Sequence, residues 1–289
     1  MEDLNIGFLG LGLIGGSIAR AIRKEYPQAI IQVYTRRKNP DLEQGVRNGI
    51  LTNLVYDIDD HFSTCDIIFL CAPVLKNIEF LHTLKPLIKK DCIITDVGSV
   101  KGNIHKTVTE LDLENNFIGG HPMAGSEKTG FSNSSADLLN NSYYLITTTS
   151  LTTEEKLQKL LSLLTCTGSN CVVLSPAEHD QITAAISHVP HIVAASLVNM
   201  VKKNDSPNQY MKEFAAGGFK DITRIASSSP EMWENICLSN KESIDYFLSY
   251  YIGSLTKFRE LIAKEDSESI RQFFSEAGQY RDSIPEKER

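Results

Sequence analysis

The stretch NIGFLGLGLIGGSIARAIRK, residues 5–24, largely determines the fold that the sequence predicts. An apolar run typical of a buried strand leads directly into the pattern GxGxxG, and an amphipathic stretch typical of a helix follows it. In this context the glycines permit a tight turn and a close approach of pyrophosphate, and the helix N-terminus offers free N–H groups. We therefore predict a dinucleotide-binding loop made of Gly10, Leu11, Gly12, Leu13, Ile14 and Gly15.

Strand-like and helix-like segments alternate up to residue 175. The apolar runs lie at 4–10, 30–34, 66–72, 91–97, 115–120, 142–148 and 170–175, and the helix-like stretches between them at 15–24, 76–87, 101–111 and 153–164. This alternation predicts an α/β domain of the Rossmann type, with a doubly wound and mostly parallel sheet, over residues 1–175.

The strand pattern stops after Ser175. Helix-like stretches follow at 176–185, 190–202, 211–226, 231–263 and 266–277. They predict an all-α domain over residues 176–289. Its helices are longer and more apolar than a small domain needs, so we expect it to form a homodimer by helix packing.

The composition narrows the class of protein. The chain has 289 residues, of which 42% are hydrophobic, and a formal charge of −7, which excludes a generally basic surface. We therefore expect no binding to nucleic acid or to a membrane. Six cysteines without a CxxC pair predict reduced thiols. The apolar stretch 6–19 follows two acidic residues and contains several glycines, so a signal peptide is not predicted and we expect a cytoplasmic protein.

The second predicted strand ends in Thr35, Arg36 and Arg37, and no carboxylate occurs before Asp41. A carboxylate here would hold the ribose 2′-hydroxyl of NAD, whereas a hydroxyl and arginines suit the 2′-phosphate of NADP. The sequence thus favours NADP, with NAD bound through the backbone as the alternative. Ala72 and Pro73, at the end of the third apolar run, are further candidate cofactor contacts.

Two polar side chains follow predicted strands at positions that line the ligand crevice of a doubly wound sheet. Ser99 lies in TDVGSVKG, residues 95–102, and we expect it beside the nicotinamide. His121 lies in GGHPMAGSE, residues 119–127, where Pro122 keeps it out of the α region. A histidine held in this way at a strand end is a candidate functional residue.

The helical domain contains a third candidate segment, GGFKDITRIASSSPEMW, residues 217–233. Lys220 and Arg224 are four residues apart, and Asp221 could pair with Arg224, so a surface salt-bridge set is the alternative interpretation. A zinc site is not predicted from the three histidines at 179, 188 and 191, because Pro190 should interrupt the helix between the last two. We interpret His179 as a capping or surface residue and expect no metal.

Taken together in this order, GLGLIGGS, DVGSVKG, HPMAGSE, SHVPH and GGFKDITRIA…MW make the chain resemble the prephenate dehydrogenase family over essentially its whole length. The family includes arogenate and cyclohexadienyl dehydrogenases. The resemblance implies oxidative decarboxylation of prephenate to 4-hydroxyphenylpyruvate with NAD or NADP, a step of tyrosine biosynthesis. We expect no appended regulatory domain after residue 277.

The resemblance also implies roles for individual residues. His121 would accept the proton of the ring hydroxyl, Ser99 would orient that histidine and bind the hydroxyl, and Arg224 would clamp the ring carboxylate. His188 would be a second active-site histidine, with Ser126 and Glu127 in its polar network. The remaining substrate-side candidates are Lys220, Gly217 and Trp233.

Two other functions remain open at this point. An arogenate dehydrogenase that uses NADP would differ only in the pocket for the substrate side chain. A nucleotide-sensing binding protein of the same fold is disfavoured, because a sensor needs no proton acceptor such as His121.

Overall fold

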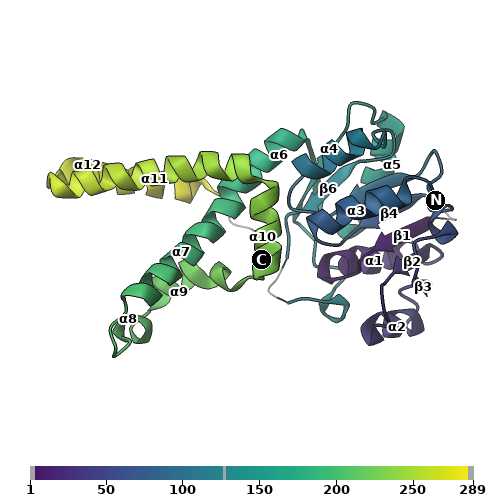
Figure 1. Cartoon of the computed structure of the whole chain (residues 1–289), viewed down its shortest axis with the longest axis horizontal. Coiled ribbons are helices and arrows are strands. Elements are labelled where there is room, and N and C mark those ends of the chain that lie inside the picture. Colours follow the sequence, from purple (N-terminus) through teal and green to yellow (C-terminus); the bar gives the residue numbers. More distant parts are fainter. Residues whose placement is uncertain (1–3, 126–127, 286–289) are drawn as a thin grey trace.

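The computed structural model describes residues 4–125 and 128–285. Figure 1 shows an α/β domain joined through helix α6 to a helical domain that extends away from it. The predicted fold class is confirmed.

The main sheet has five parallel strands in the order β3-β2-β1-β4-β5. Their bounds are β1 Asn5–Leu9, β2 Ile30–Tyr34, β3 Asn53–Val55, β4 Ile67–Leu70 and β5 Ile93–Asp96. The connecting helices are α1 Leu13–Glu25, α2 Pro40–Arg47 and α3 Val74–Leu84. Helix α2 and strand β3 were not predicted from the sequence. Asn39 caps α2, and β3 has only three residues, which are too few for a periodic signal.

A second, three-stranded sheet adjoins the first. It contains β6 Gly119–Pro122, β7 Tyr143–Thr147 and β8 Asn170–Leu174, and β6 runs antiparallel to β7. The flanking helices are α4 Gly102–Glu110 and α5 Glu154–Leu164. A parallel bridge between Ile94 and Phe117 joins the two sheets. A parallel pair needs a long crossover, usually a helix, and no α-helix is described between Pro122 and Tyr143, so β7 pairs with β6 in the opposite direction.

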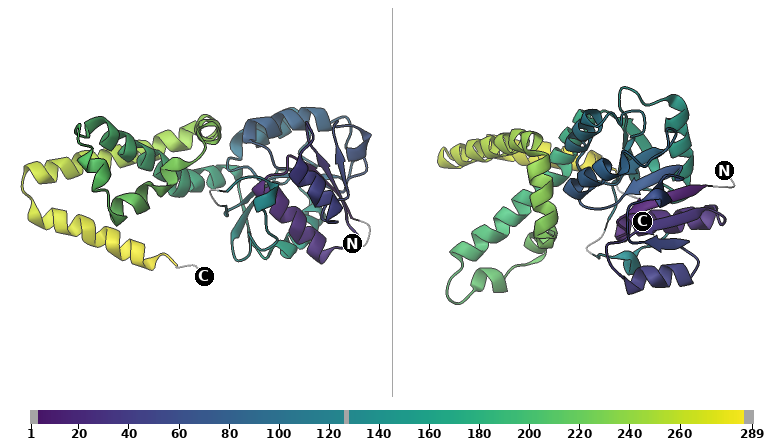
Figure 2. Two further views of the ribbon diagram at one scale, coloured as in Figure 1. Left: turned by 90° about the horizontal axis from the view of Figure 1, so that it is seen from below. Right: turned by 45° about the vertical axis from the view of Figure 1, so that its right-hand side comes forward.

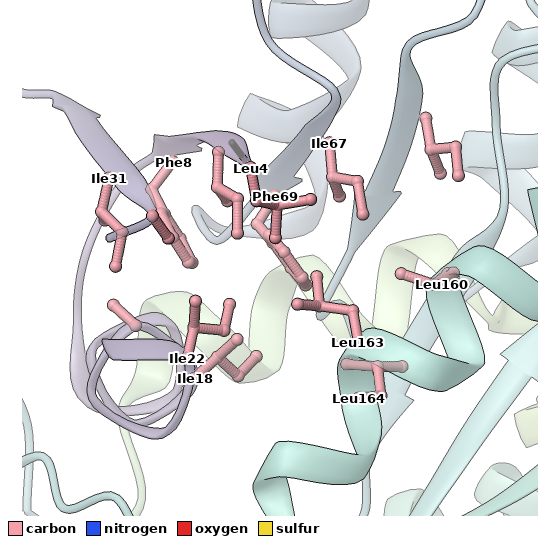
Figure 3. Packing of buried hydrophobic residues seen from close by; sticks show 14 of the residues in the cluster. Leu4, Phe8, Ile18, Ile22, Ile31, Ile67, Phe69, Leu160, Leu163 and Leu164 are labelled. Carbon is pink, nitrogen blue, oxygen red and sulfur yellow. The ribbon is translucent and has the colours of Figure 1, made fainter. Parts of the chain in front are cut away.

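Alternate residues of the central strands face opposite layers. Phe8 and Phe69 stack at 5.0 Å between ring centroids and pack with Ile18 of α1 and Leu160 of α5 (Figure 3). The side chain of Leu9 points to the opposite face of the sheet and packs with residues of α3 and α4. Burying each such side chain contributes about 1.5–3 kcal/mol. The sheet is therefore covered on both faces, and its carboxyl edge is left for a ligand.

The described chain after Ser175 is helical. Its elements are α6 Pro176–Thr183, a π-helical turn Ala184–His188, α7 Val189–Asn204, α8 Tyr210–Glu213, α9 Gly217–Thr223, α10 Pro230–Ser239, α11 Lys241–Ala263 and α12 Ser267–Ser283. Figure 2 shows α12 turning back beside α11. Ser175 and Glu178 form a capping box at the start of α6.

Two expectations about helix breaks are wrong. Pro190 does not interrupt the chain of helices, because it lies in the first turn of α7, where a proline needs no N–H partner. The predicted helix 231–263 is instead two helices that meet at Asn240. The Asn240 side chain is buried and hydrogen-bonded to the α6 region, and this tertiary contact accompanies the break.

The helical domain exposes much apolar surface. Its own core cluster is small and centres on Ala184, Val189 and Ile244, whereas Ile252 and Leu255 on α11 are exposed. The continuous helix 176–204 is long and apolar enough to cross a membrane by length and composition alone. A helix that packs against protein meets the same criterion, so this property does not by itself indicate a membrane span.

Candidate active site

The glycine-rich loop makes a tight turn close to the chain that follows β4. Gly10 has a φ of +81°, a conformation that favours glycine, and a Cβ there would lie 3.2 Å from the backbone nitrogen of Ala72. Gly12 precedes α1 and supplies no side-chain cap, and the first turn of α1 contains no acidic residue. The N–H groups of that turn therefore remain available to an anion, and the residues present fit a dinucleotide.

A buried asparagine holds the neighbouring turn. Asn77 Oδ1 accepts the Ala72 N–H at 3.0 Å, and its Nδ2 donates to the Leu70 carbonyl at 3.2 Å. Pro73 follows as the residue before α3. The structure thus brings the predicted cofactor residues Gly10, Ala72 and Pro73 to one edge of the sheet. Asn77 was not predicted as a functional residue, because its only signal in the sequence is a polar residue in the first turn of an apolar helix.

The end of β2 presents uncompensated positive charge. The Thr35 hydroxyl donates to the Arg37 carbonyl at 2.9 Å, and Arg36 and Arg37 are exposed. Neither guanidinium forms a hydrogen bond or ion pair with another residue in the described part of the chain. Their side chains are free to meet an anionic group at the adenosine end of a cofactor.

His121 lies in β6 and begins a chain of hydrogen bonds that leads to α4. Its Nδ1 is 2.9 Å from His179 Nε2, and His179 Nδ1 is 2.8 Å from Asp180 Oδ1. The Asp180 carboxylate also accepts the backbone N–H groups of Lys101 and Gly102, both at 2.8 Å. The interpretation of His179 as a capping or surface residue is therefore wrong: α6 packs against α4, and His179 is fully buried.

These bonds determine which nitrogen of His121 carries its proton. A carboxylate oxygen accepts, so the proton of His179 sits on Nδ1 and its Nε2 accepts from the Nδ1–H of His121. Burial lowers the pKa of His121 well below its usual range, and the positive charge of Lys101 lowers it further. His121 is thus a neutral imidazole whose Nε2 lone pair can accept a proton.

A buried ion pair fixes the backbone around His121. Lys101 Nζ contacts the Asp96 carboxylate and donates to the Gly120 carbonyl at 2.8 Å, while Asp96 accepts the Gly120 N–H at 3.1 Å. Burial lowers the pKa of Lys101, against the effect of Asp96. Ser99 is half-buried in the turn that this pair stabilises, but its hydroxyl makes no hydrogen bond to His121 or to any other described residue. The pair was not predicted from the sequence, because a lysine and an aspartate so close together in a loop normally indicate solvated surface.

On the helical side, His188 has the opposite tautomer. Asn240 Nδ2 donates to the Asp180 carbonyl at 2.8 Å, which identifies it as the amide nitrogen, and it lies 3.2 Å from His188 Nδ1. His188 Nδ1 must therefore accept, and its proton is on Nε2. Burial lowers the pKa of His188 to about 4, so the ring is neutral. Its buried Nε2 has no partner among the described residues.

A second unpaired donor lies next to it. The Trp233 ring centroid is 6.0 Å from that of His188, the indole stacks on His191 at 4.0 Å, and its buried Nε1 has no partner in the described residues. Arg224 starts a 3-10 turn that packs against α7, and its charge helps burial to lower the pKa of His191. The unpaired groups of His188, Trp233 and Arg224 are all hydrogen-bond donors, so they suit a ligand rich in carboxylate and carbonyl oxygens.

The other sequence-predicted residues are less closely connected. Lys220 and Gly217 are exposed on α9, and no described hydrogen bond links them to His188 or Trp233. The ion pair between Asp221 and Arg224 is absent from the described residues, which removes the salt-bridge interpretation. Ser126 and Glu127 lie outside the described residues. Within residues 4–125 and 128–285, no three His, Cys, Asp or Glu side chains are arranged to hold a metal ion.

A glycine-rich turn at the carboxyl edge of a parallel sheet, with a neutral histidine beside an all-α domain, fits a dehydrogenase of the nicotinamide-dependent class. Residues 18–186 match the family model described as prephenate dehydrogenase, nucleotide-binding domain, and residues 175–276 match prephenate dehydrogenase, dimerization domain. The chain belongs to the prephenate dehydrogenase family, and it is an oxidoreductase with a nicotinamide nucleotide-binding domain.

Three similar proteins illustrate the range of this family. Prephenate dehydrogenase of Bacillus subtilis is 37% identical over 288 residues, covering 99% of this chain and 77% of that protein. A crystal structure of prephenate dehydrogenase from A. aeolicus with hydroxyphenyl propionate and NAD+ superposes with a TM-score of 0.91, at 32% identity and 98% coverage of both chains. Synechocystis arogenate dehydrogenase has a TM-score of 0.85 at 30% identity, covering 96% of this chain and 99% of that one.

Proposed function

We propose that this protein oxidises and decarboxylates prephenate to 4-hydroxyphenylpyruvate, with arogenate as the alternative substrate. The observation that carries the proposal is the hydrogen bond from His121 Nδ1–H to His179, which leaves the Nε2 lone pair of a neutral imidazole to accept a proton. The unpaired donors of His188 and Trp233 support it, because prephenate carries two carboxylates and a ketone.

In the proposed mechanism His121 removes the proton of the C4 hydroxyl through Nε2. Bound NAD(P)+ would accept the hydride that leaves C4 as the carbonyl forms. The ring carboxylate then leaves as CO2, and its bonding electron pair makes the ring aromatic. The oxygen at C4 recovers the proton from His121, so the base is regenerated and atoms and charges balance.

We assign the binding of substrate to residues of both domains. The planar guanidinium of Arg224 would clamp the ring carboxylate with two hydrogen bonds, which a lysine could not reproduce. Ser99 would bind the ring hydroxyl beside His121. His188 and Trp233 would bind the side chain of the substrate. Ser126, Glu127, Lys220 and Gly217 complete the proposed set by resemblance to the family.

For the cofactor we propose NADP in preference to NAD. Thr35, Arg36 and Arg37 supply a hydroxyl and two unpaired cations where an NAD-specific domain has a carboxylate. Comparing kcat/KM for the two cofactors tests this proposal. A strong preference for NAD would refute it.

We propose further that the chain is a homodimer, with the exposed apolar face of α11 covered by a second copy. We propose a domain boundary between Ser175 and Pro176, and the end of β8 and the start of α6 at this point support it. The cytoplasmic location, without a membrane or nucleic-acid partner, stays a prediction.

The decisive experiment mixes the purified protein with prephenate or arogenate and with NAD+ or NADP+, and follows the absorbance of the reduced cofactor. We expect reduction with prephenate and release of CO2. Reduction with arogenate alone would establish the alternative substrate. No reduction in any combination would favour a nucleotide-binding protein without this activity.

A further inference from the structure

His121, His179 and Asp180 form a relay that crosses the domain boundary. His121 is on β6 of the α/β domain, whereas His179 and Asp180 are consecutive residues of α6. His179 has no exposed surface, and Asp180 is 7% exposed. The relay ends at the two backbone N–H groups where α4 begins, so both of its ends are anchored in the α/β domain.

Each hydrogen bond of the relay has only one possible donor and one possible acceptor. Asp180 Oδ1 already accepts the Lys101 N–H, and it can only accept from His179 as well. His179 is then left with one acceptor, Nε2, and this atom faces His121 Nδ1 at 2.9 Å. A neutral imidazole without such a partner divides between two tautomers, and in one of them Nε2 carries the proton and cannot act as a base.

We propose that His179 and Asp180 are positioning residues that hold His121 in the tautomer whose Nε2 accepts the substrate proton. The inference rests on the proposed function of His121 as the base. When His121 has taken the proton it becomes a cation, and the lone pair of His179, with the Asp180 carboxylate behind it, stabilises that charge. The helical domain therefore contributes to the base itself, besides binding the substrate.

A matched pair of substitutions at position 179 separates this role from simple packing. His179→Gln and His179→Met have similar size and flexibility, but only glutamine can accept from His121 Nδ1–H and donate to Asp180 at the same time. His179→Asn is a further control, because its shorter amide matches the position of Nδ1 and keeps the bond to Asp180 without reaching His121. It also replaces His179→Met if that variant fails to fold.

The first readout is spectroscopic and needs no activity. Proteins labelled with ¹⁵N-histidine are examined by NMR at neutral pH without substrate, and the His121 signals are assigned from their loss in His121→Asn. We expect an unprotonated Nε2 in the natural protein and in His179→Gln, and a mixture of tautomers in His179→Met and His179→Asn.

The second readout is kinetic. We expect kcat with prephenate to fall roughly 10–10²-fold in His179→Met and His179→Asn, with KM for prephenate and Kd for the cofactor nearly unchanged, and to recover in His179→Gln. Unchanged His121 tautomers in all three variants, or equal losses of kcat in all three including His179→Gln, would overturn the positioning role. If the natural protein does not oxidise prephenate, the proposed function fails, while the NMR result still decides whether His179 sets the tautomer.

Discussion

The two domains differ in how completely they bury their own apolar side chains. In the α/β domain, strands β1 and β4 are covered on both faces by helices, and Phe8 and Phe69 have no exposed surface. In the helical domain, Ile252 on α11 is 60% exposed and Phe274 on α12 is 61% exposed. The α/β domain thus buries its large apolar side chains within itself, whereas the helical domain leaves large apolar side chains exposed for another protein surface to cover.

This difference bears on function because the candidate site takes its groups from both domains. The proposed base His121 belongs to the α/β domain, and the donors of His188, Trp233 and Arg224 belong to the helical domain. We therefore expect changes in the first domain to alter the chemical step, and changes in the second to alter assembly and substrate binding.

The largest effect is expected from His121→Asn. Removing the proton acceptor should lower kcat by roughly 10²–10⁴-fold and leave cofactor affinity nearly intact, because the glycine loop is separate from β6. Steady-state kinetics and a cofactor titration by fluorescence measure the two quantities. A variant with near-normal kcat would remove His121 from the mechanism.

Ile252→Asp tests whether the exposed face of α11 is a dimer interface. A carboxylate buried twice across a two-fold axis should raise the dimer dissociation constant roughly 10²–10³-fold, as analytical ultracentrifugation would show. The matched control is Leu151→Asp, an exposed leucine of the α/β domain, which should leave the mass unchanged. If both variants stay dimeric, or if the natural protein is a monomer, the comparison between the domains fails at this point.

Arg224→Ala should act on binding more than on chemistry. Losing a charged hydrogen bond costs roughly 1.5–3 kcal/mol, so KM for prephenate should rise by about 10–10²-fold while kcat changes less. Lys203→Ala, at an exposed lysine of α7 without an assigned role, provides a comparison for general loss of positive charge. An unchanged KM in Arg224→Ala would exclude the clamp.

The smallest effect concerns the cofactor. Substituting Arg36 and Arg37 together by alanine should lower kcat/KM for NADP by about tenfold and leave that for NAD nearly unchanged, since only NADP has a 2′-phosphate. Equal losses with both cofactors would show that these arginines do not read the phosphate.

The sequence predicted those features that depend on local pattern. The glycine loop, the strand–helix alternation and the change to helices after Ser175 each follow from neighbouring residues, and all three occur in the structure. Ser175 and Pro176 also start α6 as expected, because a cap and a first-turn proline act within one turn. His121 was predicted to be a functional residue because glycines precede it and a proline follows it.

The remaining features depend on tertiary contacts that no local pattern records. His179 was interpreted as a surface residue, because its burial arises only when α6 packs on α4. The break at Asn240 accompanies a bond to the distant Asp180 carbonyl. Lys101 and Asp96 pair inside the protein because β5 and β6 come together there. The hydrogen bond between His121 and His179 was therefore not predictable.

The central claim is that a base from the α/β domain and a cation from the helical domain act on one substrate molecule. A crystal structure of the His121→Asn variant with prephenate and oxidised cofactor tests it most directly. The account predicts the ring carboxylate on Arg224 and the C4 hydroxyl within about 3 Å of the side chain at position 121. Prephenate bound with either group far from its assigned residue would contradict it.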